Sequence, residues 1–173
     1  QKIATVITSD HGETFFKKRR YHGVSLHESN IRIPIIVSAP GWPAGRTETL
    51  ASLVDVMPTI LSITGAPEAE EVDGDDLEPY VKGTRSTKGR VRFAETWYLN
   101  KKGKPKRDLV SVFDGEHKLV YNRLRNLTKF VSQKDVRRRP KNLGTKSKTA
   151  VRLRGILDGY LDKTSGPIWT EKK

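Results

Sequence analysis

The stretch KIATVITSDHGE, residues 2–13, decides the fold of this 173-residue chain. Its first part, Lys2–Thr8, is a β-branched apolar run that predicts a buried strand. The run stops at Ser9-Asp10-His11-Gly12, and in open α/β sheets ligands gather at the carboxyl ends of strands. A buried strand needs neighbours on both sides, and this one opens the chain. We therefore expect the chain to be a piece of a longer protein.

Asp10 and His11 are the candidate metal ligands of this strand end. Neighbouring strand side chains point to opposite faces, so the two can converge only where the strand turns, and Gly12 permits that turn. A carboxylate oxygen beside a neutral imidazole nitrogen suits a divalent cation. The alternative is an ordinary polar strand end with a capping aspartate, and the tetrapeptide alone favours that alternative.

A second polar cluster, YHGVSLHE, occupies residues 21–28 and follows the cationic run Lys17–Arg20. His22, followed by a glycine in a loop, can donate to an anionic ester oxygen. The alternatives are a surface histidine and a solvated charge cluster, and the spacing alone favours them. A positive rim would also steer anionic substrates, which makes Lys18 and Arg20 candidates for substrate binding.

The rest of the pattern predicts an α/β edge followed by a small antiparallel sheet that is covered by a C-terminal helix. The expected strands are Lys2–Thr8, Ile31–Ser38, Arg90–Tyr98, Leu109–Phe113 and Lys118–Tyr121. One helix is expected between Asp55, as its N-cap, and Gly65, and another over Ala150–Asp162. Residues 129–149 show little periodicity and are expected to be loop. The expected domains are residues 1–84 and 85–173.

Charge separates the chain into two halves. Residues 1–81 carry 7 Lys and Arg against 12 Asp and Glu, whereas residues 82–154 carry 23 against 5, a net charge of +18. The aromatic residues interspersed in the basic half are Trp97, Tyr98, Phe113 and Tyr121. A non-catalytic polyanion-binding module is therefore one hypothesis. A basic solvated surface is the favoured alternative, because the strand pattern should bury the aromatic side chains and no nucleic-acid-binding motif appears.

Composition limits what these 173 residues contain. The chain has no cysteine, which excludes a disulfide scaffold, a thiolate metal site and a cysteine nucleophile within it. No stretch approaches the roughly 18 consecutive apolar residues of a membrane span.

Ordered stretches over residues 8–83 resemble motifs of the sulfatases, within the alkaline phosphatase superfamily. TSDHGE (8–13) matches the same stretch there, and HGVSLHESNIRIPIIVSAPG (22–41) is similar to HGxSLYEExIRVPLIVxxPG. LVDVMPTILSITG (53–65) resembles LVDLxPTLLDLAG, and residues 72–83 resemble the DGxSLxPLLxG run. Several motifs in the right order are far more specific than any one of them.

The resemblance implies the edge of an alkaline-phosphatase-like α/β sandwich and sulfuric ester hydrolysis by the full-length protein. It implies that Asp10 and His11 bind one divalent cation, with calcium expected and Mg²⁺, Mn²⁺ or Zn²⁺ as alternatives. It gives His22 the role of contacting the sulfate and assisting the leaving oxygen. Glu13 either orients a metal ligand or is a surface carboxylate. The family's nucleophile motif, CxPxR or SxPxR, is absent here, so the chain alone is expected to be inactive.

The same superfamily supplies the competing functions. A phosphoester or phosphonate hydrolase, or a phosphoethanolamine or phosphoglycerol transferase, shares the metal-binding strand end and differs in its nucleophile. The expected partner is an anionic sulfate ester, such as a sulfated glycan, and no specific nucleic acid is expected. Because the family is mostly exported, a periplasmic or extracellular location is expected.

Overall fold

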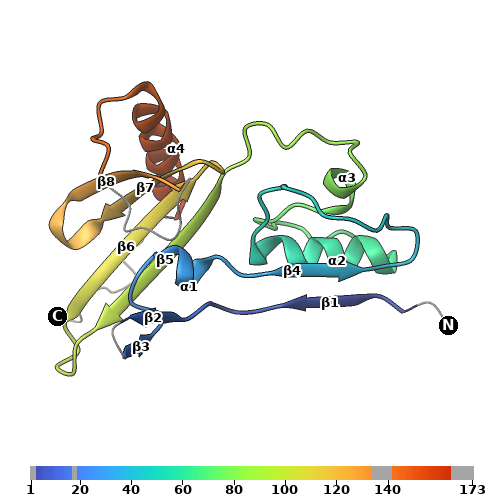
Figure 1. Ribbon diagram of the computed structural model, residues 1–173, viewed down its shortest axis with the longest axis horizontal. Helices are drawn as coiled ribbons and strands as arrows, with labels where there is room; N and C mark the ends of the chain where they lie inside the picture. Colours follow the sequence, from blue (N-terminus) through green and yellow to red (C-terminus); the bar gives the residue numbers. More distant parts are fainter. Residues whose placement is uncertain (1–2, 17–18, 134–141, 165–173) are drawn as a thin grey trace. The chain divides into compact units, whose positions relative to one another are not determined.

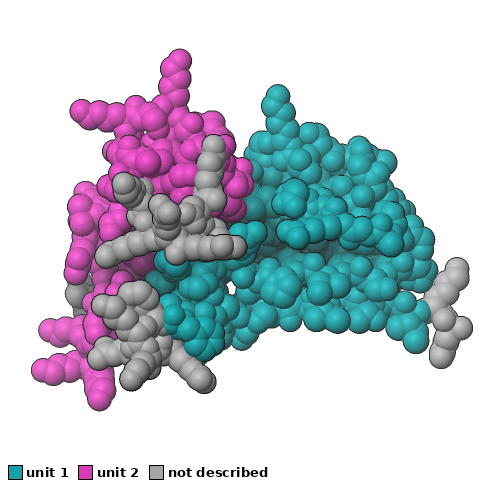
Figure 2. All heavy atoms as spheres, in the orientation of Figure 1, with its two compact units in different colours: residues 1–92 teal, residues 93–173 magenta. Residues whose placement is uncertain are grey.

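The computed structural model describes residues 3–16, 19–133 and 142–164 (Figure 1). They form two compact units, residues 1–92 (unit 1) and 93–173 (unit 2), which Figure 2 shows in separate colours. The predicted domain boundary after residue 84 stays a prediction. In the described part of the chain, none of the helices is both long and apolar enough to cross a membrane.

Unit 1 contains two antiparallel strand pairs (Figure 1). β1 pairs with β4, with Thr5 opposite Ser38 and Thr8 opposite Ile35. β2 pairs with β3. The bounds of these strands are β1 Thr5–Thr8, β2 Thr14–Phe16, β3 Arg19–Tyr21 and β4 Ile35–Ser38.

Both strands predicted in this unit are shorter than expected. The predicted strand over Ile31–Ser38 starts only at Ile35, because Ile31 ends helix α1, Glu28–Ile31, and the segment between them contains Pro34. A proline lacks the N–H that a strand ladder needs. The carbonyl of Pro34 instead accepts a hydrogen bond from the Thr8 hydroxyl at 2.8 Å. This contact joins the end of β1 to the start of β4.

Helix α2, Val56–Thr64, confirms the helix predicted in unit 1. It ends at Gly65, whose φ of 69° lies in the left-handed region that favours glycine. The shorter helices of this unit are η1, Leu53–Asp55, and α3, Glu78–Val81. Asp55 is the N-cap residue of α2 as predicted, but its carboxylate makes no capping bond to α2.

Asp55 lies instead at the centre of a buried ion-pair network. Its side chain is fully buried and contacts the guanidinium groups of Arg90, at 3.3 Å, and Arg92, at 2.9 Å. Arg90 also bonds to Asp75 at 2.8 Å, and its guanidinium lies over the ring of Tyr80, 3.9 Å from the centroid. The network thus joins η1, the acidic loop after α2 and the start of β5 within unit 1.

Gly74 is required by a close backbone approach next to this network. A Cβ on Gly74 would lie 1.9 Å from the carbonyl oxygen of Val54. We expect Gly74→Ala to lower the free energy of unfolding by about 2–3 kcal/mol, because the backbone must shift to relieve the clash. Urea unfolding of the two proteins measures the difference. The exposed neighbour Asp73→Ala is the control, with an expected change within about 0.5 kcal/mol; equal values for both variants would contradict this prediction.

Unit 2 is a four-stranded sheet with strand order β5-β6-β7-β8, next to helix α4 (Figure 1). The bounds of its elements are β5 Arg92–Leu99, β6 Pro105–Phe113, β7 His117–Asn122, η2 Arg123–Arg125, β8 Leu127–Ser132 and α4 Lys148–Thr164. The predicted antiparallel sheet and C-terminal helix are confirmed. The prediction of loop over residues 129–149 is wrong at both ends, where β8 and α4 extend into it, and residues 134–141 lie outside the described residues.

The core of unit 2 lies between this sheet and α4. Val112 pairs with Leu119, and Leu119 pairs with Phe130, so one apolar row crosses three neighbouring strands. Leu153 and Leu157 of α4 are fully buried, and α4 packs against β6 and β7. The helix spacing of four residues places both leucines on one face, which the sequence periodicity predicts.

Candidate functional site

The loop after β1 is held against α1 by its backbone. The Gly12 N–H donates to the Asn30 carbonyl at 2.8 Å. A Cβ on Gly12 would lie 2.1 Å from the Ser29 carbonyl oxygen, so a side chain does not fit here. The chain turns at this point, and the side chains of Asp10 and His11 converge.

A group of hydrogen-bonded polar side chains, which we call the clamp, supports this loop. It comprises Thr14, Ser25, Ser29 and Asn30. The Thr14 hydroxyl bonds to the Ser29 hydroxyl at 2.6 Å and donates to the amide oxygen of Asn30. The Asn30 amide nitrogen in turn donates to the Ser25 carbonyl at 3.3 Å and to its hydroxyl at 3.1 Å. The clamp therefore ties β2, α1 and the segment after His22 together.

His11 has the orientation of a metal-binding histidine. Its Nδ1 lies 2.8 Å from the Gly12 carbonyl oxygen, which can only accept, so Nδ1 is the donor and Nε2 is the atom that would bind a metal in the neutral ring. Nε2 lies 3.5 Å from Oδ2 of Asp10. Two ligand atoms bound to one cation, each at about 2.0–2.5 Å, lie roughly 3 Å apart in adjacent positions. The two side chains thus fit a shared divalent cation.

Asp10 supplies an ionised carboxylate to this pair. The His11 backbone N–H donates to Asp10 Oδ1 at 2.9 Å, and this bond is the main cause that lowers the pKa of Asp10. The Ser9 hydroxyl adds a smaller effect in the same direction. Because the side chain of Asp10 is 84% exposed, its second oxygen is open to a ligand.

His22 and Glu13 complete a group of four side chains, which we call the strand-end cluster: Asp10, His11, Glu13 and His22. The rings of His22 and His11 are stacked, with centroids 4.3 Å apart and planes inclined by 18°. His22 Nδ1 lies 3.0 Å from Glu13 Oε2, and this hydrogen bond is the main cause that lowers the pKa of Glu13. Glu13 is therefore ionised near neutral pH and holds the His22 ring beside His11.

The strand-end cluster supplies part of a coordination shell. Across residues 3–16, 19–133 and 142–164, no group of three or more His, Cys, Asp and Glu side chains could hold a metal ion. Structural zinc takes four ligands and calcium about six to eight, so the cation's other ligands would come from elsewhere. One oxygen of Glu13, Oε1, is buried and has no hydrogen-bond partner within the described part of the chain.

The structure brings all four predicted residues of the strand-end cluster together, and their roles stay predictions. Lys18 lies outside the described residues. Arg20 lies in β3, opposite Phe15, and its side chain is also outside the description, so substrate binding by either residue stays a prediction. Sequence reasoning missed Thr14 and Asn30. Asn30 is buried in the short, mainly polar helix α1, so hydrophobic periodicity does not reveal its burial. Its partner Thr14 lies 16 residues away in the sequence, so the local pattern does not reveal the hydrogen bond either.

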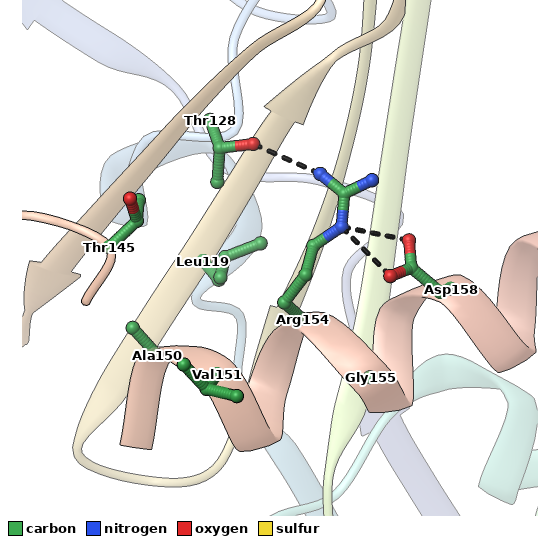
Figure 3. A pocket seen from close by; sticks show the side chains of 8 residues that line it. All are labelled: Leu119, Thr128, Thr145, Ala150, Val151, Arg154, Gly155 and Asp158. Atoms are coloured by element: carbon green, nitrogen blue, oxygen red, sulfur yellow. Dashed lines mark hydrogen bonds and ion pairs between the residues drawn. The ribbon is translucent and has the colours of Figure 1, made fainter. Parts of the chain in front are cut away.

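Unit 2 has a cleft of its own, with a volume of about 440 Å³, between α4 and strands β7 and β8 (Figure 3). Figure 3 shows Arg154 pointing toward Asp158, to whose two oxygens its Nε donates at 2.8 and 3.0 Å. Its Nη1 donates to the Thr128 hydroxyl at 3.1 Å. Asp158 is the main cause that raises the pKa of Arg154 further. The guanidinium of Arg154 is thus already neutralised, and among the described residues that line the cleft there is no set of metal ligands.

Comparison with known proteins finds a matching family model and similar curated proteins. Residues 2–66 match the family model described as Sulfatase. Arylsulfatase K of Homo sapiens is 32% identical over 93 residues, which are 53% of this chain and 17% of the relative. Arylsulfatase K of Rattus norvegicus is 36% identical over 85 residues, which are 49% of this chain and 15% of the relative. The matches to Arylsulfatase K of these and other vertebrates cover only 15–18% of the relatives' length.

Solved structures share the fold over nearly the whole chain. BT1596, a 2-O GAG sulfatase, superposes with a TM-score of 0.71 at 21% sequence identity. The superposition covers 93% of this chain and 36% of the BT1596 chain. BT4656, solved with its substrate D-glucosamine-2-N,6-O-disulfate, gives 0.73 at 19% identity, with coverage of 98% and 36%. The phosphonate monoester hydrolase SpPMH from Silicibacter pomeroyi gives 0.70 at 21% identity, with coverage of 91% and 34%.

These neighbours confirm the predicted alkaline-phosphatase-like α/β fold. Members of the sulfatase family typically bind a divalent metal ion, which agrees with the pairing of Asp10 and His11. The match over residues 2–66 contains the whole strand-end cluster and the clamp beneath it. Residues 2–66 are thus similar to the sulfatase family, in sequence to its family model and to Arylsulfatase K.

Proposed function

We propose that this chain is part of an enzyme that hydrolyses a sulfate ester, and that it contributes two metal ligands and the leaving-group side of the site. The observation that carries the proposal is the approach of Asp10 Oδ2 to His11 Nε2 at 3.5 Å, with His22 stacked on His11. The chain contains neither CxPxR nor SxPxR, so the nucleophile belongs to polypeptide outside these 173 residues.

Each residue of the strand-end cluster has a task in this proposal. A divalent cation held by Asp10 and His11 would neutralise charge that builds on the sulfate oxygens in the transition state. Asp10 presents an anionic oxygen, and His11 presents the lone pair of Nε2. His22 donates from Nε2 to the leaving oxygen as that oxygen gains charge, while its Nδ1–H stays bonded to Glu13.

We propose calcium as the cation, with Mg²⁺, Mn²⁺ and Zn²⁺ as alternatives. Calcium takes mainly oxygen ligands, and the ionised Asp10 carboxylate is one. Metal analysis of the purified full-length protein identifies the ion. Its removal with a chelator should abolish turnover, and addition of the native ion should restore it.

Turnover by the full-length protein tests the proposed reaction. A chromogenic aryl sulfate should be hydrolysed far faster than the matching aryl phosphate or aryl phosphonate. Faster hydrolysis of the phosphonate or the phosphate would replace the sulfatase proposal by the phosphoester or phosphonate alternative, which shares this fold. The 173-residue chain alone should show no turnover, and clear activity from it would contradict the assignment of the nucleophile to another region.

Glu13 is expected to act by positioning His22. In the full-length protein, Glu13→Gln should lower kcat about 10–100-fold, because a neutral amide holds the His22 ring less firmly, while the bound metal content stays unchanged. Steady-state kinetics and metal analysis of the same samples separate the two effects. If the variant lost its metal instead, Glu13 would act on the cation and not on His22.

We further propose that the substrate is a sulfated sugar and that the protein acts in the periplasm or outside the cell. Support for the substrate class comes from BT4656, whose structure contains a disulfated glucosamine. Export is supported by the family resemblance.

A further inference from the structure

We propose that the β5–β6 hairpin of unit 2 is a docking surface for an anionic, sulfated polysaccharide. The basic hairpin comprises residues 97–107, which include the end of β5, the connecting loop and the start of β6 (Figure 1). This surface shares no residue with the strand-end cluster. Only the choice of a sulfated glycan over other polyanions rests on the proposed function.

Unit 2 carries the entire net charge of the protein. Residues 93–173 contain 21 Lys and Arg against 8 Asp and Glu, a net charge of +13, whereas residues 1–92 contain 12 of each. A unit with such a one-sided charge attracts polyanions over distances up to about 10 Å at ordinary ionic strength.

Several cations of unit 2 are used inside the fold. Arg123 pairs with Glu95 at 3.0 Å and with Asp108 at 3.1 Å. Arg154 is likewise held by Asp158. These side chains are not available to a large anionic ligand.

The cations of the basic hairpin are different. Five cations and no acid occupy residues 101–107: Lys101, Lys102, Lys104, Lys106 and Arg107. All five are exposed, and none of them forms an ion pair with a carboxylate in the part of the chain that the structure describes. The charge of the hairpin is therefore left for a ligand from outside.

The loop that carries these cations is ordered by Asn100. Its side-chain oxygen accepts the backbone N–H groups of Lys102, at 2.8 Å, and Lys104, at 3.1 Å. The Asn100 N–H donates to the Lys104 carbonyl at 2.8 Å, and Gly103 adopts a φ of 73° that suits the turn. An ordered loop loses less conformational entropy on binding than a flexible one.

Exposed aromatic rings flank the same cations. Trp97 is 48% exposed and Tyr98 is 41% exposed, so the expectation that the strand pattern buries them is wrong. Lys106 Nζ lies 5.9 Å from the centroid of the Tyr98 ring. Amphipathic rings beside cations suit a ligand with both apolar sugar faces and anionic groups.

The chemistry favours a polysaccharide over a nucleic acid. Four of the five cations are lysines, which act as point charges and lack the planar fork with which arginine binds guanine edges. The hairpin therefore recognises charge and not base sequence.

Binding of heparin to the full-length protein tests the proposal. In the variant with Lys101, Lys102, Lys104 and Lys106 changed to Gln, the affinity for heparin should fall about ten- to a hundredfold, and the slope of log Kd against log salt should decrease by about two to four. Turnover of a small aryl sulfate should stay unchanged. The matching Lys→Arg variant keeps the charge and should bind heparin like the parent protein.

A matched control separates the hairpin from net charge. It changes the exposed lysines Lys88, Lys146, Lys148 and Lys163 to Gln, and its affinity should fall less than about threefold. Equal losses in the two variants, or equal affinity for heparin and for single-stranded DNA of the same charge, would overturn the proposal. Heparin binding through the hairpin without any sulfate hydrolysis would refute the proposed function and leave the docking surface standing.

Discussion

Replacement of Asp10 by alanine in the full-length protein is expected to lower kcat for sulfate ester hydrolysis about a thousandfold and to release the bound divalent cation. The cation is expected to supply several kcal/mol of transition-state stabilisation, and each 1.4 kcal/mol is about a factor of ten in rate. The pKa of Asp10 is lowered by the His11 N–H, so the carboxylate is ionised and able to bind at neutral pH. Steady-state kinetics and metal analysis of the same samples measure the two effects.

The control for this prediction is Asp73→Ala, which removes an exposed carboxylate of unit 1 and should leave kcat and metal content unchanged. His11→Ala should act in the same direction as Asp10→Ala, because its Nε2 lies 3.5 Å from Asp10 Oδ2. Affinity for the metal should decrease as the pH falls through the lowered pKa of Asp10, because the protonated acid no longer binds it. Full metal content in the Asp10→Ala protein would contradict the ligand assignment.

Replacement of Asp55 by alanine is expected to lower the free energy of unfolding by about 3–5 kcal/mol. The substitution leaves Arg90, only 6% exposed, and Arg92, 17% exposed, without their shared carboxylate. It also removes the acceptor of the Ser52 and Asp75 backbone N–H groups, each at 2.8 Å. Both guanidinium groups keep Asp75, at 2.8 Å from Arg90 and 3.5 Å from Arg92, but one carboxylate then serves two largely buried cations. Buried N–H donors that lose their acceptor carry the cost of desolvation. Urea unfolding measures the change, with the same m-value (the slope of unfolding free energy against urea concentration) used for parent and variant.

Asp55→Asn should be milder than Asp55→Ala. Burial raises the pKa of the Asp55 carboxyl, while the N–H groups of Asp75 and Ser52 and the guanidinium of Arg90 act against it. An amide keeps an oxygen acceptor at that position and has no charge to desolvate. Asp75→Asn, in a side chain that is 34% exposed, should also cost less. A loss under about 1 kcal/mol for Asp55→Ala would show that the network contributes little.

The local sequence pattern predicted correctly those elements whose structure depends on residues nearby in the sequence. Gly65 ends α2 in the left-handed conformation because the chain must leave a helix there, and residues 150–162 form most of α4 because their apolar spacing matches one helix turn. β8 was missed because Leu127–Ser132 is short and lies in a cation-rich stretch, and it becomes a strand by pairing with β7.

Asp55 shows that a sequence pattern can predict the position of a residue at a helix start without predicting its hydrogen-bond partners. It precedes a helix, as a capping residue does, yet its partners are Asp75, Arg90 and Arg92, which lie 20 to 37 residues further along the chain. Trp97 and Tyr98 show the same limit, since alternation in a strand does not reveal that both rings lie at an uncovered part of the sheet.

The sequence by itself determined that Asp10 and His11 stand at the end of a strand, that Gly12 follows them and that His22 lies in a nearby loop. Residue type and spacing are properties of the chain, and they are enough to indicate a resemblance to the sulfatases and to name the candidate ligands. Only the tertiary structure decided that Asp10 Oδ2 and His11 Nε2 approach to 3.5 Å, that Glu13 holds His22, and that the clamp of Thr14 and Asn30 supports them. These contacts join side chains up to 16 residues apart, and such distances depend on how the whole unit packs.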